Sequence, residues 1–213
     1  MRKLTSAAVF VAAVILIPGI ASAENFYAAV RGGPGLTPDN ENGLTGFPRT
    51  TEEYKVGLTG SGAVGYFFPF GLRGEGEVGF IYSPVKRDGG VDVDGSVKSY
   101  LVMANAYYDL KLPGLLPFKP YFGVGIGGAR VNNDHQIPVP FFGGRKFDID
   151  EWRTAFAYQG RVGVGYELSK LWDLTLGYRY VHIEGGHIDS GGRRINLDEI
   201  RNHSVEIGFA IKF

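Results

Sequence analysis

Hydrophobic residues recur at every second position along most of this chain, and this period of two constrains the fold more than any other feature. At the end of the chain Val205, Ile207, Phe209, Ile211 and Phe213 alternate with small or charged residues. Successive side chains of a strand point to opposite faces, whereas a helix requires a period of 3.6. The sequence therefore predicts an all-β fold.

Eight segments of this kind follow one another, and their connections alternate between short and long. The predicted strands are approximately 26–33, 55–68, 72–82, 98–110, 119–131, 153–168, 172–184 and 201–213. The short connections are 69–71, 111–118 and 169–171, and the long ones are 34–54, 83–97, 132–152 and 185–200. Short turns at one end and long polar loops at the other are typical of an outer-membrane barrel.

The two faces of the predicted strands have an inverted polarity. Bulky and aromatic residues share one face, and the other face holds mainly Gly, Ala, Ser, Thr, Arg and Glu. A soluble sandwich or lipocalin-like barrel, the alternative, would bury its apolar face inside because water lies outside. The inversion predicts lipid outside, and hence an eight-stranded antiparallel transmembrane up-and-down β-barrel over residues 24–213. Many of the 33 glycines would then leave room in a narrow interior.

This register directs charged side chains of both signs into the lumen. They are Arg31, Arg73, Glu75, Glu77, Asp109, Arg161, Glu167, Arg179, Glu206 and Lys212. Since buried charges are generally paired, we expect a network in which the four arginines neutralise Glu75, Glu77, Glu167 and Glu206. The alternative is a wet lumen in which each charge is hydrated. Neither arrangement predicts an open pore.

Aromatic residues near the strand ends predict an interfacial girdle. The residues assigned to it are Tyr54, Tyr66, Tyr82, Tyr100, Tyr108, Tyr121, Tyr166, Trp152 and Trp172.

The first 23 residues have the pattern of a secretory signal peptide. A basic start at Arg2 and Lys3 precedes an unbroken apolar run over 7–17, and Ala21 and Ala23 form a cleavage site. The run is too short to cross a bilayer, which takes about 20 residues. We expect cleavage after Ala23 and export of the mature chain.

Several segments resemble the OmpA-like, opacity-type outer-membrane β-barrel family of Gram-negative bacteria. They are PYFGVGIGGA over 120–129, LGYRY over 176–180, HSVEIG over 203–208, and the terminal Phe213. The resemblance implies residence in the outer membrane, contact with its lipid and lipopolysaccharide, and a last strand whose Phe209, Ile211 and Phe213 are read by the barrel-assembly machinery. Many such proteins carry a second, peptidoglycan-binding domain, but this sequence ends at the barrel, which argues against a role as a cell-wall tether.

Other sequence motifs do not predict enzymatic or cofactor chemistry. The G-x-G-x-x-G patterns at 60–65 and 123–128 continue as strand, whereas a dinucleotide site needs a turn that opens a helix. The 22 basic and 22 acidic residues leave no basic excess, so no nucleic-acid partner is expected. The chain has no cysteine for a metal site or a nucleophile. We expect no cofactor.

Histidines and acidic pairs leave a few chemical alternatives open. His182, His187 and Asp189 form a possible metal site, but a solvated loop explains them as well. Asp92 and Asp94 form a fragment of a calcium loop without its distal glutamate. His203 and Ser204 are adjacent in a strand, so their side chains point to opposite faces and cannot act as a catalytic pair. We therefore predict no metal and no catalytic residue.

The sequence as a whole predicts a non-enzymatic surface protein. Its barrel would be an envelope scaffold, and its four long loops would contact host cells or envelope components. The apolar run over 137–142 fits such a contact, although folding back onto the barrel mouth is the alternative. A lipid-A-modifying enzyme and a small-solute channel are the competing functions.

Overall fold

The structure is a computed structural model that describes most of the chain after the predicted signal peptide. The described residues are 25–38, 41–42, 50–51, 53–54, 56–88, 91–110, 117–138, 146–190, 193–197 and 199–213. Their side chains are described within 25–38, 56–84, 96–110, 117–132, 153–185 and 199–213. The predicted signal peptide lies outside the described residues.

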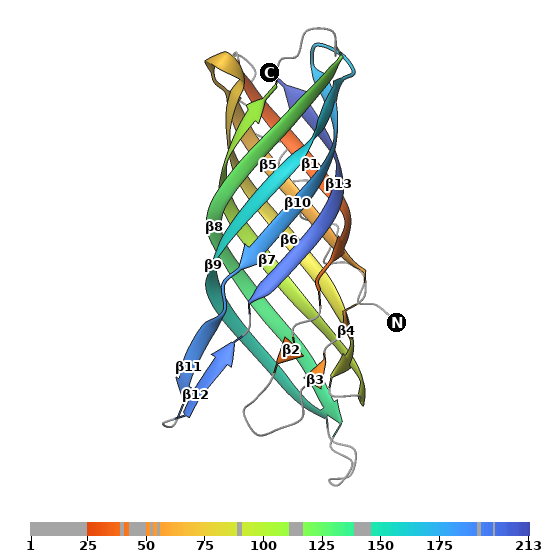
Figure 1. Ribbon diagram of the computed structural model, residues 1–213, viewed down its shortest axis with the longest axis vertical. Helices are drawn as coiled ribbons and strands as arrows, with labels where there is room; N and C mark the ends of the chain where they lie inside the picture. The colour runs from red at the N-terminus through yellow and green to blue at the C-terminus, as the bar shows by residue number, and fades with distance from the viewer. Residues whose placement is uncertain are drawn as a thin grey trace.

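Within the described residues, eight long strands form a closed antiparallel ring (Figure 1). In ring order they are β1 (Phe26–Leu36), β5 (Gly57–Phe67), β6 (Leu72–Asp88), β7 (Val91–Asp109), β8 (Phe118–Pro138), β9 (Lys146–Glu167), β10 (Trp172–Ile183) and β13 (Ile200–Lys212). Each strand pairs with the next one in the ring, and β1 pairs with β13 to close it. The predicted eight-stranded up-and-down barrel is confirmed.

The two ends of the barrel differ in their connections (Figure 1). The end with the 3-10 turn η1 (Pro69–Gly71) and the C-terminus is called the short-turn end. The opposite, long-loop end carries three short additions to the ring. These are the pair β2 (Glu41–Asn42) with β3 (Thr50–Thr51), the strand β4 (Glu53–Tyr54) on β6, and the hairpin of β11 (Gly186–Ser190) with β12 (Arg193–Leu197).

Four strands are longer at the long-loop end than the sequence pattern predicts. The pairing of β6 with β7 continues to Asp88 and Val91, so most of the predicted loop 83–97 is strand. The pairing of β8 with β9 continues to Pro138 and Lys146, within the predicted loop 132–152. Beyond a membrane both faces of a ribbon meet water, so the period of two that reveals a half-buried strand disappears there.

The inward and outward faces follow the predicted register. Along β7, Leu101 and Met103 are 2% and 3% exposed, whereas Val102 between them is 66% exposed. The outward band of the barrel is apolar and includes Val78, Val124, Ile126, Val162, Leu176 and Ile207. Among the described residues, no helix is long and apolar enough to cross a membrane.

The short turns follow from their residues. In the turn between β9 and β10, the Ser169 hydroxyl oxygen accepts hydrogen bonds from the backbone N–H groups of Leu171 and Trp172, both at 3.2 Å. In the turn between β5 and β6, Phe70 and Gly71 have φ of 64° and 85°. A Cβ at Gly71 would lie 2.7 Å from the carbonyl oxygen of Asp109, so this position requires glycine.

Three tyrosines in the lumen lie directly across from glycines on the neighbouring strand. The pairs are Tyr27 with Gly65, Tyr107 with Gly123, and Tyr121 with Gly163. A Cβ at Gly65 or Gly123 would overlap the facing ring, and one at Gly163 would lie 2.6 Å from the Tyr121 hydroxyl oxygen. The tyrosine rings thus occupy the space that these glycines leave in the narrow interior.

The position of Tyr121 corrects the predicted aromatic girdle. Its side chain is buried in the lumen, because it shares a face with Gly123 and Gly125. The other girdle residues whose side chains are described face outward, namely Tyr66, Tyr82, Tyr100, Tyr108, Tyr166 and Trp172. The side chains of Tyr54 and Trp152 lie outside the described part.

Candidate functional site

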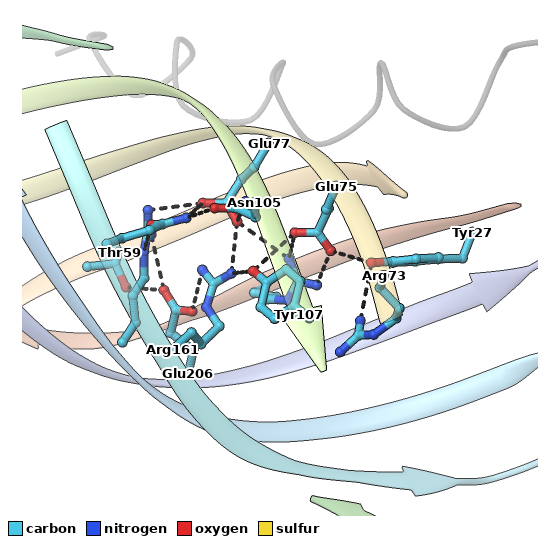
Figure 2. A network of polar contacts seen from close by, with 12 residues as sticks. Tyr27, Thr59, Arg73, Glu75, Glu77, Asn105, Tyr107, Arg161 and Glu206 are labelled. Atoms are coloured by element: carbon cyan, nitrogen blue, oxygen red, sulfur yellow. Dashed lines mark hydrogen bonds and ion pairs between the residues drawn. The ribbon is translucent and has the colours of Figure 1, made fainter. Parts of the chain in front are cut away.

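Six buried charged side chains meet in the middle of the lumen (Figure 2). They come from five strands and are Arg31, Glu75, Glu77, Arg161, Arg179 and Glu206. We call this set the ionic layer. Three guanidinium groups face three carboxylates, so the layer is neutral when all six are ionised. It contains six of the eight residues that the sequence assigned to a lumenal network.

The Arg31–Glu75 pair forms one part of the ionic layer. Arg31 Nη1 donates to Glu75 Oε1 at 2.8 Å, and Nη2 donates to Oε2 at 2.6 Å. Two parallel hydrogen bonds of this kind match the planar guanidinium fork and are among the strong ones in proteins. Glu75 also accepts hydrogen bonds from the hydroxyls of Tyr27 and Tyr107, at 2.8 and 3.3 Å. This carboxylate is therefore fully surrounded by donors.

Glu77 is held by guanidinium groups on both sides. It accepts hydrogen bonds from Arg161 Nη1 at 2.9 Å and from Arg179 Nη2 at 3.0 Å. Arg31 Nη1 lies 3.5 Å from it, which links the two parts of the layer.

Glu206 is held less firmly than Glu77. Its contacts to Arg179 Nη1 and to the Thr59 hydroxyl are 3.3 and 3.4 Å long. Arg161 Nη2 lies 3.1 Å from Glu206 Oε2, but neither of these buried atoms makes a hydrogen bond within the described residues. Glu206 is thus the loosest carboxylate of the ionic layer.

Uncharged side chains that were not predicted from the sequence complete the layer. Gln159 accepts a hydrogen bond from Arg179 Nε at 2.7 Å and donates to Asn105 at 2.5 Å. The Tyr107 hydroxyl accepts a hydrogen bond from Arg161 Nη1 at 2.5 Å. The signal that could have identified them is their position, since they occupy the inward faces of β7 and β9.

Arg73 lies outside the ionic layer, closer to the short-turn end. It pairs with Asp109, with Nε 2.8 Å from Oδ2, rather than with a glutamate as predicted. Its guanidinium carbon is 4.8 Å from the centre of the Tyr107 ring and 5.6 Å from that of Tyr27. Arg73 Nη1 also donates to the Tyr27 hydroxyl at 3.2 Å, which connects it indirectly to Glu75 (Figure 2).

Glu167 is also separate from the ionic layer. It forms an ion pair with Lys119 at the short-turn rim, where both side chains are partly exposed. Lys212 and Asp173 form a similar pair there at 2.8 Å. The predicted pairings of Arg73 and Glu167 were wrong because the period of two fixes the face of a residue and leaves its depth in the lumen open.

Apolar side chains fill the lumen on the long-loop side of the ionic layer. This apolar cluster consists of Ile81, Val97, Leu101, Met103, Ala129, Val131, Ala157, Val181 and Ile183. The sequence pattern predicted mainly small and charged residues on the inward face, and the apolar cluster corrects that prediction. The ionic layer and the apolar cluster together occupy successive levels of the lumen.

The candidate catalytic neighbours His203 and Ser204 point to opposite sides of the barrel wall. Ser204 is buried on the inward face. His203 faces outward, where its Nδ1 lies 2.5 Å from the Tyr178 hydroxyl and its ring is 5.0 Å from that of Tyr180. The two side chains therefore do not share a reaction centre.

The candidate metal-binding residues are only partly described. The His182 ring stacks on Tyr158 with 4.6 Å between centroids, and its Nε2 lies 3.5 Å from Glu199. The side chains of His187 and Asp189, those of Asp92 and Asp94, and those of the apolar run 137–142 lie outside the described part. Among the residues that the structure does describe, no group of three His, Asp or Glu could hold a metal ion.

A family model described as "Outer membrane protein beta-barrel domain" matches residues 7–213. The chain belongs to this outer-membrane β-barrel family. In such proteins the short turns face the periplasm and the longer loops face the exterior. The short-turn end is therefore periplasmic, the long-loop end is extracellular, and the outward apolar band meets the lipid of a Gram-negative outer membrane.

Uncharacterized proteins of Brucella abortus, Brucella suis and Brucella melitensis are 36% identical to this chain over 110 residues. The match covers 49% of this chain and 37% of the relatives, so the chain spans little more than a third of their length.

Solved structures support the fold. Neisserial surface protein A is 21% identical, with a TM-score of 0.58 over 88% of this chain and 97% of that protein. OprG of Pseudomonas aeruginosa is 15% identical, with a TM-score of 0.52 over 89% of this chain and 96% of that protein. At these identities the likeness shows the barrel architecture alone.

Proposed function

We propose that this protein is a non-enzymatic outer-membrane scaffold whose extracellular hairpins mediate adhesion or other surface contacts. The β8–β9 hairpin carries the proposal. Its pairing continues to Pro138 and Lys146, whereas β10 stops pairing with β9 at Ile183 and Ala157. The Glu184 N–H donates to the Phe156 carbonyl at 2.9 Å, and the hairpin extends beyond this point: over 146–152 no described strand pairs with the outer edge of β9.

An edge of this kind suits recognition of an extended polypeptide. A strand at a sheet edge presents unpaired N–H and C=O groups, to which a partner segment can add as a further strand. Main-chain hydrogen bonds then supply affinity. The proposed partner is an extended segment of a host or envelope protein.

The filled lumen supports a scaffold over a channel. The ionic layer and the apolar cluster occupy successive levels between the two ends, and the side chains of both are buried. We expect planar bilayers that contain the pure protein to show no steady conductance. Large, stable, ion-selective openings would contradict the scaffold and favour a solute channel.

The opposite orientations of His203 and Ser204 support a scaffold over a lipid-A-modifying enzyme. We expect mass spectra of lipid A to be identical with and without the gene. Loss or gain of an acyl chain that depends on His203 or His182 would establish the enzyme instead.

Adhesion is tested by shortening the β8–β9 hairpin. Replacement of residues 133–151 by a two-residue Asn-Gly turn joins the paired residues Asn132 and Trp152 and removes most of the edge, so it should abolish binding of expressing cells to host cells or to purified envelope components. The barrel should still migrate differently on gels before and after heating, since surface insertions contribute little stability. Removal of the β11–β12 hairpin is the matched control and should retain binding. Equal binding by both variants would refute the assignment to β8–β9.

Export and assembly are part of the same proposal. Cleavage after Ala23 predicts a mature chain that begins at Glu24, which N-terminal mass spectrometry would measure. The Phe213 N–H donates to the Phe26 carbonyl at 3.0 Å, so the last residue belongs to the closing strand pair. We expect deletion of Phe213 to reduce the heat-modifiable form, because the assembly machinery would read Phe209, Ile211 and Phe213 as a unit. Normal assembly without Phe213 would contradict this role.

A further inference from the structure

A cavity of about 620 Å³ lies in the periplasmic half of the lumen. Its lining extends from Arg31 in the ionic layer to residues of the rim, among them Asn25, Gly71 and Leu110. Ligand pockets typically enclose about 300–1,000 Å³ and combine mostly apolar walls with a few polar groups. The cavity therefore has the size of a small-molecule site, and its polar groups determine which class of molecule it suits.

Among the described residues, each charged side chain that lines the cavity already has a partner of opposite charge. The pairs are Arg31–Glu75, Arg73–Asp109, Lys119–Glu167 and Lys212–Asp173. The Arg73 guanidinium group contacts both oxygens of its carboxylate, at 2.8 and 2.9 Å. A charged ligand would have to displace one of these partners, because a buried charge needs a counter-charge. The cavity therefore favours a neutral molecule.

Aromatic rings form one wall of the cavity. The rings of Tyr27, Phe67 and Tyr121 come from β1, β5 and β8. The Tyr27 and Phe67 ring centroids are 4.7 Å apart, and the Arg73 guanidinium carbon lies 5.5–5.8 Å from the centres of all three rings. Aromatic faces attract a cation, so Arg73 holds the three rings in place. The wall suits the packing of a ring or a compact hydrocarbon body.

Two hydroxyl groups of the lining, those of Tyr121 and Thr175, make no hydrogen bond within the described part of the chain. A Cβ at Gly177 would lie 2.6 Å from the Tyr121 hydroxyl oxygen, so this hydroxyl lies against the inward face of β10. Thr175 is two residues away from Gly177 along the same strand and faces the same side. A hydroxyl both donates and accepts, so the two groups are available to orient the polar end of a ligand.

From this arrangement we propose that the cavity is a binding site, entered from the periplasm, for a small neutral amphipathic molecule. The ligand has an aromatic or alicyclic body and one hydroxyl or carbonyl group. The body packs on the aromatic wall, and the polar group forms hydrogen bonds with Tyr121 and Thr175. Because the ionic layer and the apolar cluster lie on the extracellular side, this site is separate from the hairpins proposed for adhesion.

The test uses the full barrel in lipid nanodiscs and the neutral probe 4-(trifluoromethyl)benzyl alcohol, followed by fluorine NMR, with empty nanodiscs as the control. We expect saturable binding of the alcohol. Binding of 4-(trifluoromethyl)benzoate should be at least about tenfold weaker, because its charge finds no free partner. Equal uptake of the alcohol by empty and loaded nanodiscs would show partition into lipid and overturn the proposal. Benzoate binding as tight as that of the alcohol would overturn it as well.

Two glycines of β9 provide a matched pair of variants. Gly165 lines the cavity directly across from Thr175, and a Cβ there has no neighbour closer than 3.6 Å, so the backbone tolerates a side chain. Gly165→Leu should fill the cavity and weaken binding of the alcohol at least about tenfold. Gly160 lies on the outward face, where a Cβ meets nothing within 4 Å, and Gly160→Leu should bind normally. Equal affinity of the two variants would refute the location.

The hydroxyl contacts have their own variants. Tyr121→Phe removes only a hydroxyl that makes no hydrogen bond in the barrel, so the fold should be retained. It should weaken binding of the alcohol about three- to tenfold and leave that of 4-(trifluoromethyl)toluene, which has no hydroxyl, unchanged. Thr175→Val should act in the same way, and Tyr108→Phe, which removes an outward hydroxyl, is the control. Unchanged affinity for the alcohol in both Tyr121→Phe and Thr175→Val would overturn the proposed site.

Discussion

The ionic layer and the apolar cluster fill the same lumen by different means. Along β10, Arg179 belongs to the first and Val181, two residues later, to the second. Along β6, Glu77 belongs to the ionic layer and Ile81, four residues later, to the apolar cluster. The ionic layer depends on the pairing of every charge, whereas the apolar cluster depends on volume. The comparison shows that the interior of this barrel can be filled in two ways: by charged side chains that are all paired, or by apolar side chains that pack closely.

The largest loss of stability is expected when Arg179, the most buried cation of the ionic layer, is replaced. Arg179→Leu should lower the free energy of unfolding by about 3–5 kcal/mol, because it leaves Glu77 and Glu206 short of a partner. Urea unfolding in detergent micelles would measure the loss. The double variant Arg179→Leu/Glu77→Leu removes one charge of each sign and should lose much less. Equal losses in the two variants would show that pairing is not what stabilises the layer.

A somewhat smaller effect is expected in the apolar cluster. Leu101→Ala should cost about 3 kcal/mol, since it leaves a cavity among packed side chains. The loss should be the same at low and high salt, unlike a loss that arises from charge. Val102→Ala is the control on the lipid side, where acyl chains replace the missing methyl groups, and should change the unfolding free energy little. If the loss of unfolding free energy in Leu101→Ala depended on salt, the apolar cluster would not differ from the ionic layer in the way proposed.

The tyrosine–glycine pairs offer an intermediate test of packing. Gly123→Ala should destabilise the barrel by about 1–3 kcal/mol, because the new methyl group overlaps the Tyr107 ring. The shift would also disturb the Tyr107 hydroxyl, which contacts both Glu75 and Arg161. The control is Gly76→Ala, where a Cβ meets nothing within 4 Å. Similar urea midpoints for the two variants would contradict the proposed packing of Tyr107.

The smallest effect is expected at the rim. Lys119→Gln should cost only about 0.2–1 kcal/mol, because the Lys119–Glu167 pair is partly exposed and the solvent screens it. The same urea titration as for Arg179→Leu would measure it. If Lys119→Gln lowered the free energy of unfolding as much as Arg179→Leu, the buried ion pairs of the ionic layer would not contribute more stability than the exposed pair at the rim.

Much of the fold could be predicted from the sequence, because alternation assigns each strand residue to a face. Arg31, Arg161 and Arg179 lie inside as predicted by their register. Tyr121 was misassigned because its nearness to a strand end outweighed the fact that it shares a face with Gly123. A consistent use of the same period would have placed it in the lumen.

The depth of a residue could not be predicted in the same way. Glu167 shares the inward face with Arg161, yet strand tilt and register place it beside Lys119 at the rim. The contacts of Gln159 and Asn105 also depend on how distant strands meet across the lumen. The apolar cluster had a visible signal in Leu101 and Met103, which alternate with outward residues, but the expectation of a polar lumen hid it.

The strand pair that closes the ring has a consequence for the order of events during biogenesis. Tyr27 of β1 pairs with Lys212 of β13, so the first and last strands of the described chain depend on each other. Contacts between such distant residues are slow to form, because a long loop must close before they contribute. Until β13 has been synthesised, β1 has no partner on that side. The ring therefore cannot close before β13 is made, and the apolar strands need protection from aggregation throughout that delay.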